Sequence, residues 1–255
     1  MSNKQAHQLM TRIEQDLGIL EMYPPHDRGS PSRWASPSKW KAPAGGAVHF
    51  SKRRYLGRMP AGWRQAIVEA APVGSEYYTP LLVMALTGVR PAELKKGVSV
   101  TITAQGCLLI TIKGAKVSTT TGQPERRLWV RVDNPTAWQL FAAVTASDPE
   151  QGLRVSIQDP RTFCDHIRSL SRKLYPKIRY VASPYSFRHA FASDQKAMHV
   201  PDEMLAKMMG HVSARSKQGY GVARQGRMPI SNVDAVTASR PIRHADGPAR
   251  AIPQL

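Results

Sequence analysis

The spacing of apolar residues changes along this chain, and that change restricts the fold more than any other feature. Trp63, Ile67 and Ala71 recur at the interval of an amphipathic helix, and a second helical stretch spans 75–87. Between 98 and 132 the chain instead becomes rich in β-branched residues. Helical spacing then returns. Because helices and strands occupy separate stretches, we predict a mainly α domain of the α+β class with a small antiparallel sheet.

The predicted sheet has three strands. They cover Val98–Thr103, Cys107–Lys113 and Arg127–Val132. Ala104-Gln105-Gly106 connects the first pair, and a long turn from 118 to 124 connects the second pair. Both connections are short enough for antiparallel neighbours, so we expect a three-stranded antiparallel sheet.

Five helical stretches are predicted after the sheet, covering 134–146, 159–174, 185–198, 201–209 and 214–220. The first two open with Asn134-Pro135 and Asp159-Pro160, in which the Asx residue caps the helix and proline fits its first turn. After Gly221 the chain is polar and contains prolines, and no core element is expected there.

The chain carries a large excess of positive charge. It has 36 lysine and arginine residues against 18 aspartate and glutamate residues, a formal net charge of +18. Lysine and arginine that dock on phosphates release condensed counterions, so this balance favours a nucleic-acid partner. Charge alone does not separate DNA from RNA or from an anionic membrane surface.

No membrane, metal or cofactor role is expected. The longest apolar run, 81–86, is too short to span a bilayer, and the first residues lack the core of a signal peptide. We therefore expect a cytoplasmic protein. Cys107 and Cys164 lack paired spacing, so neither a zinc site nor a disulfide framework is indicated.

Two regions hold candidate chemistry. The first reads TGVRPAEL at 87–94 and includes Arg90; taken alone, it also fits one helix ending at Gly88 and another beginning at Pro91. The second contains YSFRH at 185–189, MMGH at 208–211 and then Tyr220. Arg188 precedes His211 by 23 residues, and Tyr220 follows His211 by nine.

In order and spacing these boxes resemble the tyrosine recombinase family, the phage integrases and Cre-like or lambda-integrase-like catalytic domains. The resemblance covers about residues 58–221. It implies a site-specific recombinase that cleaves and rejoins DNA through a 3′-phosphotyrosine, to integrate or excise a mobile element. It also implies metal-independent transesterification, double-stranded DNA as partner, a homotetramer on DNA and a bacterial or phage origin.

The residue types suit that reaction. Two guanidiniums, Arg90 and Arg188, can hold a phosphate that gains negative charge under attack. The hydroxyl of Tyr220 is a poor nucleophile until its proton is removed, because its ordinary pKa is about 10. A neighbouring imidazole, His211, is a suitable partner for that proton.

The family also supplies a lysine acid from the hairpin after its first box, and this chain offers two. Lys113 and Lys116 both lie in ITIKGAK at 110–116. We favour Lys116, because alignment of the strand that contains Ile110 and Ile112 with Cre-like enzymes puts it at the position of the acid, whereas a short-turn integrase register favours Lys113. Whichever is not the acid is a solvated or phosphate-contacting charge.

The sequence departs from the family pattern at Tyr185, which stands where the family has histidine. Its phenol can donate a hydrogen bond to phosphate but cannot change charge near neutral pH as histidine does. The neighbouring His189 is expected to pack structurally. Met209 replaces the usual leucine, a substitution that conserves volume.

The predicted organisation has three parts. Residues 1–57, rich in proline and glycine, form a partly ordered arm without a full core-binding domain; 58–221 form the catalytic domain; 222–255 form a tail that neighbouring protomers could exchange. Such a short arm suggests a looser grip on DNA or an accessory DNA-binding protein. The alternative functions are a catalytically weakened DNA-binding accessory protein and a type IB topoisomerase-like enzyme.

Overall fold

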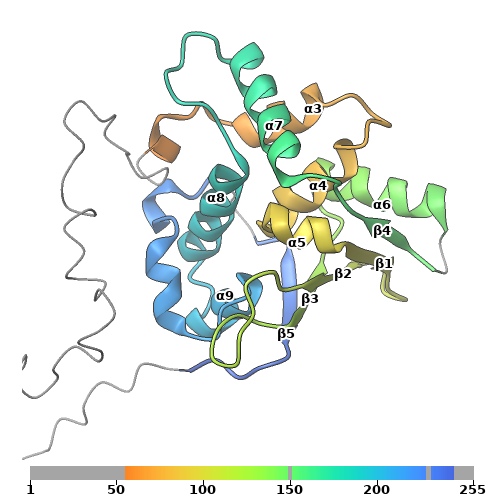
Figure 1. Cartoon of the computed structure of the whole chain (residues 1–255), viewed down its shortest axis with the longest axis vertical. Helices are drawn as coiled ribbons and strands as arrows, with labels where there is room; N and C mark the ends of the chain where they lie inside the picture. The colour runs from red at the N-terminus through yellow and green to blue at the C-terminus, as the bar shows by residue number, and fades with distance from the viewer. Residues whose placement is uncertain (1–54, 149–150, 228–230, 244–255) are drawn as a thin grey trace, which may run out of the picture. The chain divides into compact units, whose positions relative to one another are not determined.

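One antiparallel sheet organises the described part of the chain, residues 55–148, 151–227 and 231–243 of this computed structural model. Its five strands follow the order β4-β1-β2-β3-β5 (Figure 1). The strands are β1 (Val98–Ile102), β2 (Leu108–Lys113), β3 (Glu125–Val130), β4 (Leu153–Val155) and β5 (Val233–Ala238). The chain divides into units Met1–Phe50 and Ser51–Leu255, and the first lies outside the described residues, as does most of the predicted arm.

The expectation of three strands is wrong in number, because β4 and β5 extend the sheet at its two edges. β4 has only three residues, too few for an alternating pattern to be recognised. β5 lies beyond Gly221, where no core element was expected, and it pairs with β3 from Arg126↔Ala238 to Val130↔Val233. Pairing over such a sequence separation leaves no local signal.

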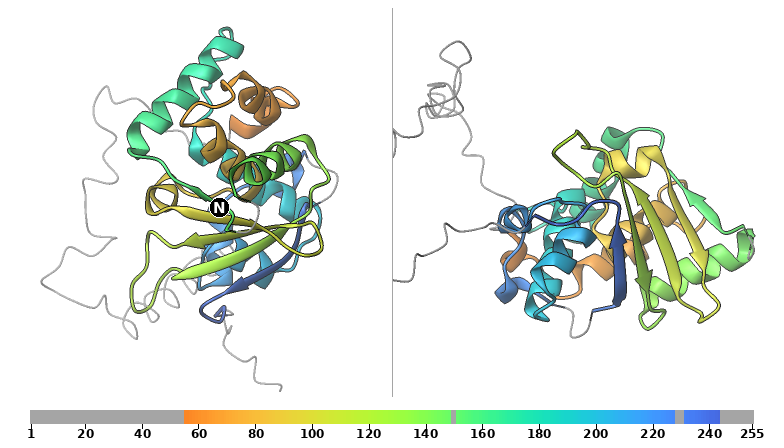
Figure 2. Two further views of the ribbon diagram at one scale, coloured as in Figure 1. Left: turned by 90° about the vertical axis from the view of Figure 1, so that its right-hand side faces the viewer. Right: turned by 90° about the horizontal axis from the view of Figure 1, so that it is seen from below.

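One face of the sheet is buried and the other is open. Val98, Val100, Ile110 and Leu128 are fully buried, and they share one face through the register of β1, β2 and β3. Lys113 projects from the other face, where it lies opposite Glu125. Figure 2 shows the helices gathered against one side of the sheet.

The described residues form seven α-helices, some of which pack on that buried face and the others on those helices. They are α3 (Trp63–Ala70), α4 (Tyr78–Thr87), α5 (Pro91–Lys96), α6 (Pro135–Ser147), α7 (Pro160–Leu174), α8 (Pro184–Ala197) and α9 (Asp202–Met208). The predicted caps form: Asn134 Oδ1 accepts from the Ala137 amide at 3.0 Å, and Asp159 accepts from two amides at the start of α7. The last predicted helix is instead the 3₁₀ helix η3 (Ala214–Gly219).

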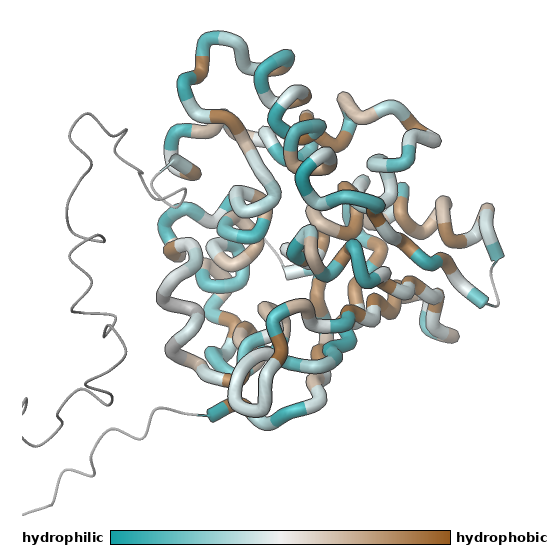
Figure 3. The backbone as a smooth tube through the Cα atoms, viewed as in Figure 1, coloured by the Kyte–Doolittle hydropathy of each residue, from teal (hydrophilic) through white to brown (hydrophobic). Residues whose placement is uncertain are grey.

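The core runs from α4 to the inner face of the strands. Leu81, Leu82, Val83 and Met84 of α4 are fully buried, and hydrophobic residues recur in Figure 3 where these helices and strands meet. α4 ends at Gly88, whose φ of +61° is a left-handed conformation that favours glycine. Among the described helices, none combines the length and apolar character needed to cross a bilayer.

Candidate functional site

Arg90 occupies the junction between α4 and α5. Its extended backbone immediately precedes Pro91, so the chain turns sharply after Gly88 and presents the Arg90 side chain at the start of α5. One guanidinium nitrogen donates to Glu93 Oε1 at 2.8 Å, and the other lies 3.3 Å from His211 Nε2. Arg90 is thus held from behind by a carboxylate while it faces an imidazole.

Arg188 reaches the same imidazole from α8. Its side chain is buried; Nη1 donates to the Gly88 carbonyl at 2.8 Å, and Nη2 donates to the Met209 carbonyl. Nη2 also lies 3.4 Å from His211 Nε2. Burial and the neighbouring Arg90 lower the pKa of Arg188 to about 10, which still leaves it a cation at neutral pH.

His211 is a neutral ring between two cations. Burial, followed by the charges of Arg188 and Arg90, lowers its pKa to about 3. Because guanidinium N–H groups only donate, Nε2 is the acceptor, and the proton of the neutral ring belongs on Nδ1. The ring can therefore accept a hydrogen bond at Nε2, on the side that faces the arginines.

Tyr220 follows η3 and stacks on this cluster. Its ring centroid lies 5.3 Å from that of His211, and the Arg188 guanidinium carbon lies 4.9 Å from the ring centre. Burial raises the pKa of the phenol, but the charges of Arg188 and Arg90 and hydrogen bonds from both outweigh that effect and lower it. A phenol that ionises more readily is a better nucleophile.

The backbone around Tyr220 is fastened to α8. Lys196 Nζ donates to the Tyr220 and Gly221 carbonyls at 2.6 and 2.8 Å, and the Gly221 amide lies 3.3 Å from His189 Nδ1. A Cβ at Gly221 would meet Ser193 Oγ at 2.2 Å, so this approach requires glycine. His189 is buried and contributes to this fastening.

The other predicted residues lie at the edge of this cluster. Tyr185, 40% exposed, stands in the first turn of α8, three residues before Arg188. Lys113 ends β2, and Lys116 is exposed in the turn that follows. Among the described residues, neither ammonium forms a hydrogen bond to Arg90, Arg188, His211 or Tyr220.

The Lys116 turn is nevertheless tied to the His211 turn through the buried side chain of Gln123. Its amide nitrogen donates to the His211 carbonyl at 3.0 Å and to the Arg240 carbonyl at 2.9 Å. Its oxygen accepts from the Arg240 amide at 2.8 Å. Arg240 in turn donates to the Ser118 carbonyl at 2.6 Å, so the segment after β5 closes over the hairpin.

Sequence reasoning missed Gln123 and Arg126. Arg126 is fully buried and forms an ion pair with Glu93, with Nη2 at 2.9 Å from Oε2. A signal existed, because Arg126 shares the inward parity of Leu128 and Val130 in β3. A charged residue in an inward position requires a buried partner.

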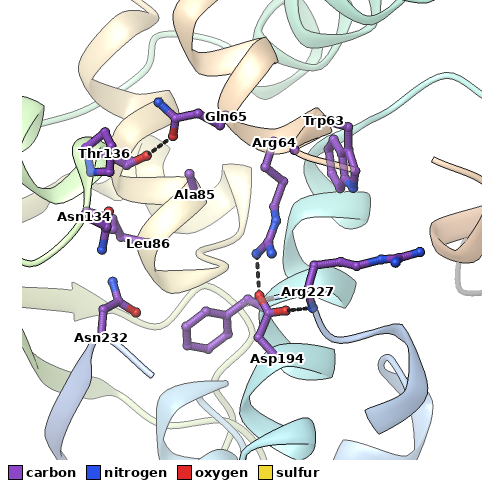
Figure 4. Close-up of a pocket in the computed structure, with 13 residues that line it drawn as sticks. Trp63, Arg64, Gln65, Ala85, Leu86, Asn134, Thr136, Asp194, Arg227 and Asn232 are labelled. Atoms are coloured by element: carbon purple, nitrogen blue, oxygen red, sulfur yellow. Dashed lines mark hydrogen bonds and ion pairs between the residues drawn. The ribbon is translucent and has the colours of Figure 1, made fainter. Parts of the chain in front are cut away.

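A separate cavity of about 230 Å³ lies between α3, α4, α8 and the segment after Tyr220. Figure 4 shows Asp194 beneath it, paired with Arg64 at 2.6 Å and accepting from the Arg227 amide at 2.7 Å. These contacts anchor the chain that follows Tyr220 to α3 and α8. In the residues that the structure describes, no group of three or more His, Cys, Asp or Glu side chains could hold a metal ion.

Comparison with known proteins gives similarity to solved structures only. No family model matches the sequence. No curated protein matches it either. The crystal structure of XerA recombinase is similar with a TM-score of 0.48 and 22% identity over 64% of this chain and 58% of that one.

Two further solved structures were found. XerH site-specific recombinase bound to palindromic difH substrate, a post-cleavage complex, gives a TM-score of 0.45 and 13% identity over 64% of this chain and 48% of that one. The Tn1549 transposon integrase in complex with a circular intermediate DNA gives a TM-score of 0.40 and 14% identity over 63% of this chain and 58% of that one. The chain thus covers less than two thirds of each of these structures.

Proposed function

We propose that this chain is a tyrosine recombinase that cleaves and rejoins double-stranded DNA through a covalent bond to Tyr220. The observation that carries the proposal is the convergence of Arg90, Arg188 and His211 on the Tyr220 ring. Two fork-shaped cations beside a phenol of lowered pKa and a neutral imidazole suit nucleophilic attack on a phosphodiester.

The proposed reaction is a transesterification. Arg90 and Arg188 first turn their N–H groups from His211 to the phosphate oxygens, whose negative charge offsets the two cations that hold the pKa of His211 low. The Tyr220 oxygen then attacks phosphorus as its proton passes towards His211. A P–O(Tyr) bond forms and the P–O5′ bond breaks, with a proton delivered to the leaving 5′ oxygen. A 5′ hydroxyl of another strand reverses the step. Arg–phosphate contacts supply the charge stabilisation, so the scheme uses neither metal nor cofactor.

The hairpin geometry supports Lys116 as the acid. Lys113 projects from the open face of the sheet, whereas the inward face carries Arg126 towards Glu93 and Arg90. Lys116 lies in the turn that Gln123 ties to the His211 carbonyl. Tyr185, one helical turn before Arg188, is proposed as a hydrogen-bond donor to the bound phosphate.

Lys116→Ala is expected to cripple cleavage of ordinary DNA and to be largely rescued by a 5′ bridging sulfur at the scissile phosphate. A thiol ionises several pKa units below an alcohol, at about 8.5 for a cysteine-like thiol, so it leaves without an acid. Lys113→Ala should show one modest defect on both substrates and a shallower salt dependence of binding. The measurement is single-turnover cleavage. Rescue of Lys113→Ala instead would assign the acid to Lys113; rescue of neither would turn attention to Tyr185.

The proposed organisation follows from the same assignment. Residues 58–221 are the catalytic domain, 1–57 an arm on DNA, and 222–255 a tail, with four protomers assembling two duplexes. The tail is not wholly free for exchange, because β5 pairs with β3 of its own chain. Integration or excision of a mobile element is the proposed biological outcome.

The decisive experiment captures covalent adducts. The protein is incubated with fragmented genomic DNA of its source cell, denatured, and the DNA attached to protein is sequenced. A plasmid with two copies of the recovered site should then yield recombined joints. Relaxed circles alone would indicate a type IB topoisomerase, and a mobility shift without adducts would indicate an accessory DNA-binding protein.

A further inference from the structure

Arg126 stands in an unusual place for a charged residue. It is the second residue of β3 and lies on the buried face of the sheet, flanked along the strand by Glu125 and Arg127, which are partly or fully exposed. Arg126 Nη1 donates to Glu93 Oε1 at 3.1 Å, and Nη2 donates to Oε2 at 2.9 Å. This is a two-pronged ion pair between the sheet and α5, with both side chains removed from solvent.

Glu93 also serves Arg90, so one carboxylate joins two arginines. Besides the two bonds from Arg126, it accepts from the Arg90 amide at 2.8 Å and from Arg90 Nη1 at 2.8 Å. Burial raises the pKa of Glu93, but Arg126 and then Arg90 outweigh burial and hold it well below its ordinary value. The Glu93 carboxylate is therefore ionised, and it accepts hydrogen bonds from Arg90 on one side and from Arg126 on the other.

Arg126 also lies beneath the turn that carries His211. Gly210, which precedes His211, has a φ of +67°, and a Cβ there would lie 2.7 Å from Arg126 Nη1. Only glycine allows this approach, both by its conformation and by its size. One guanidinium thus contacts the support of Arg90 on one side and the support of His211 on the other.

We propose that Arg126 is a positioning residue, which shares Glu93 with Arg90 so that the Arg90 guanidinium remains turned towards His211 and the phosphate position. This inference rests on the proposed function. Without Arg126, the charge of Glu93 would be balanced by Arg90 alone, and the carboxylate would draw the Arg90 side chain towards α5. The positive charge of Arg90 would then be neutralised by Glu93 instead of by the DNA phosphate.

Four variants separate positioning from simple stability. Arg126→Gln removes the charge and the fork, Arg126→Lys keeps the charge and loses the fork, and Glu93→Gln removes the shared carboxylate. The matched control is Arg127→Gln, next along the strand but on the exposed face. Each is measured for melting temperature, DNA affinity and single-turnover adduct formation on the site recovered by adduct capture.

We expect Arg126→Gln to slow adduct formation at saturating DNA by roughly 10- to 100-fold, the scale set by a displaced catalytic group. DNA affinity should stay within about threefold of the wild-type value, because one buried residue makes no phosphate contact. Arg126→Lys should melt nearer the wild-type temperature yet remain slow. In a Glu93→Gln background, Arg126→Gln should slow the reaction no further than about twofold, because both changes act on Arg90.

A second readout needs no DNA. Tyr220 is faced by Arg90, Arg188, His189 and His211, and Arg90 contributes to lowering its pKa. Displacing Arg90 should therefore raise the Tyr220 pKa in Arg126→Gln and in Arg126→Lys, but not in Arg127→Gln. Carbon-13 NMR of the tyrosine Cζ in the free protein measures it, with Tyr220→Phe identifying the resonance.

The outcomes distinguish the two proposals. Suppose that wild-type protein forms adducts, and that both Arg126 variants have wild-type rates and a wild-type Tyr220 pKa. The role of Arg126 would then be overturned while the proposed recombinase activity stands. If wild-type protein forms no adduct, the proposed function fails, and the Tyr220 titration alone then decides whether Arg126 positions Arg90. A third outcome is that adduct formation slows in the Arg126 variants only in proportion to their loss of melting temperature, and slows equally in the Glu93→Gln background. Arg126 would then be a structural residue and not a positioning residue.

Discussion

Tyr220→Phe is expected to abolish the covalent protein–DNA adduct while leaving the fold and the DNA affinity nearly unchanged. The substitution removes one hydroxyl and keeps the ring, whose contacts with His211, His189 and Arg188 hold this part of the chain. Loss of one polar contact should change the free energy of DNA binding by no more than about 1 kcal/mol. Loss of the nucleophile leaves no atom to bond to phosphorus.

The measurement uses a nicked suicide substrate on which the adduct accumulates and survives denaturing electrophoresis. Tyr77→Phe is the matched control, since the Tyr77 ring packs against Phe163 and His166 on α7. That variant should form adduct at the wild-type rate. A denaturation-stable adduct from Tyr220→Phe would show that another side chain is the nucleophile.

Loss of either arginine should slow cleavage by roughly two or more decades, the usual effect of removing one donor to a developing oxyanion. Arg90→Ala is the cleaner variant for the fold, because Glu93 keeps both bonds from Arg126 and the bond from the backbone amide of residue 90. Arg188 supports the carbonyls of Gly88 and Met209 from a buried position, so its alanine variant would also melt earlier.

Arg188→Lys therefore accompanies Arg90→Ala, since it keeps a buried cation while it removes the fork. Both are compared with wild-type protein in single-turnover cleavage at saturating DNA, with and without EDTA. The chelator should change none of the rates. Activity that disappears in EDTA and returns with magnesium would replace this scheme with a metal-dependent nuclease reaction, and wild-type rates in both variants would remove the arginines from it.

Local signals made much of the fold predictable. Asx-Pro pairs located the starts of α6 and α7 within a residue, because a cap and a proline act on their own turn. The middle strands were found from their β-branched residues. The two edge strands were not predicted. β4 is too short to show an alternating pattern, and β5 is defined by its pairing with β3, which is distant in the sequence.

The candidate site divides in the same way. Arg90, Arg188, His211 and Tyr220 were identified by order and spacing, and the fold brings all four together. The residues that hold these four in place, Gln123 and Arg126, are explained only by their contacts in the folded chain, so the sequence pattern indicates them less clearly. Gln123 was unremarkable in a polar turn, whereas Arg126 could have been noticed as a charge at an inward strand position.

The closure of the hairpin by the segment after β5 bears on when a newly made molecule becomes able to act. Arg240 bonds to Gln123, which is 117 positions earlier in the chain, and Gln123 in turn bonds to the His211 carbonyl. Because translation runs from the N-terminus, the segment that contains Arg90 leaves the ribosome before the segments that contain His211 and Arg240 have been synthesised. For the proposed recombinase, the cleavage centre is therefore complete only after translation has passed β5 and Arg240.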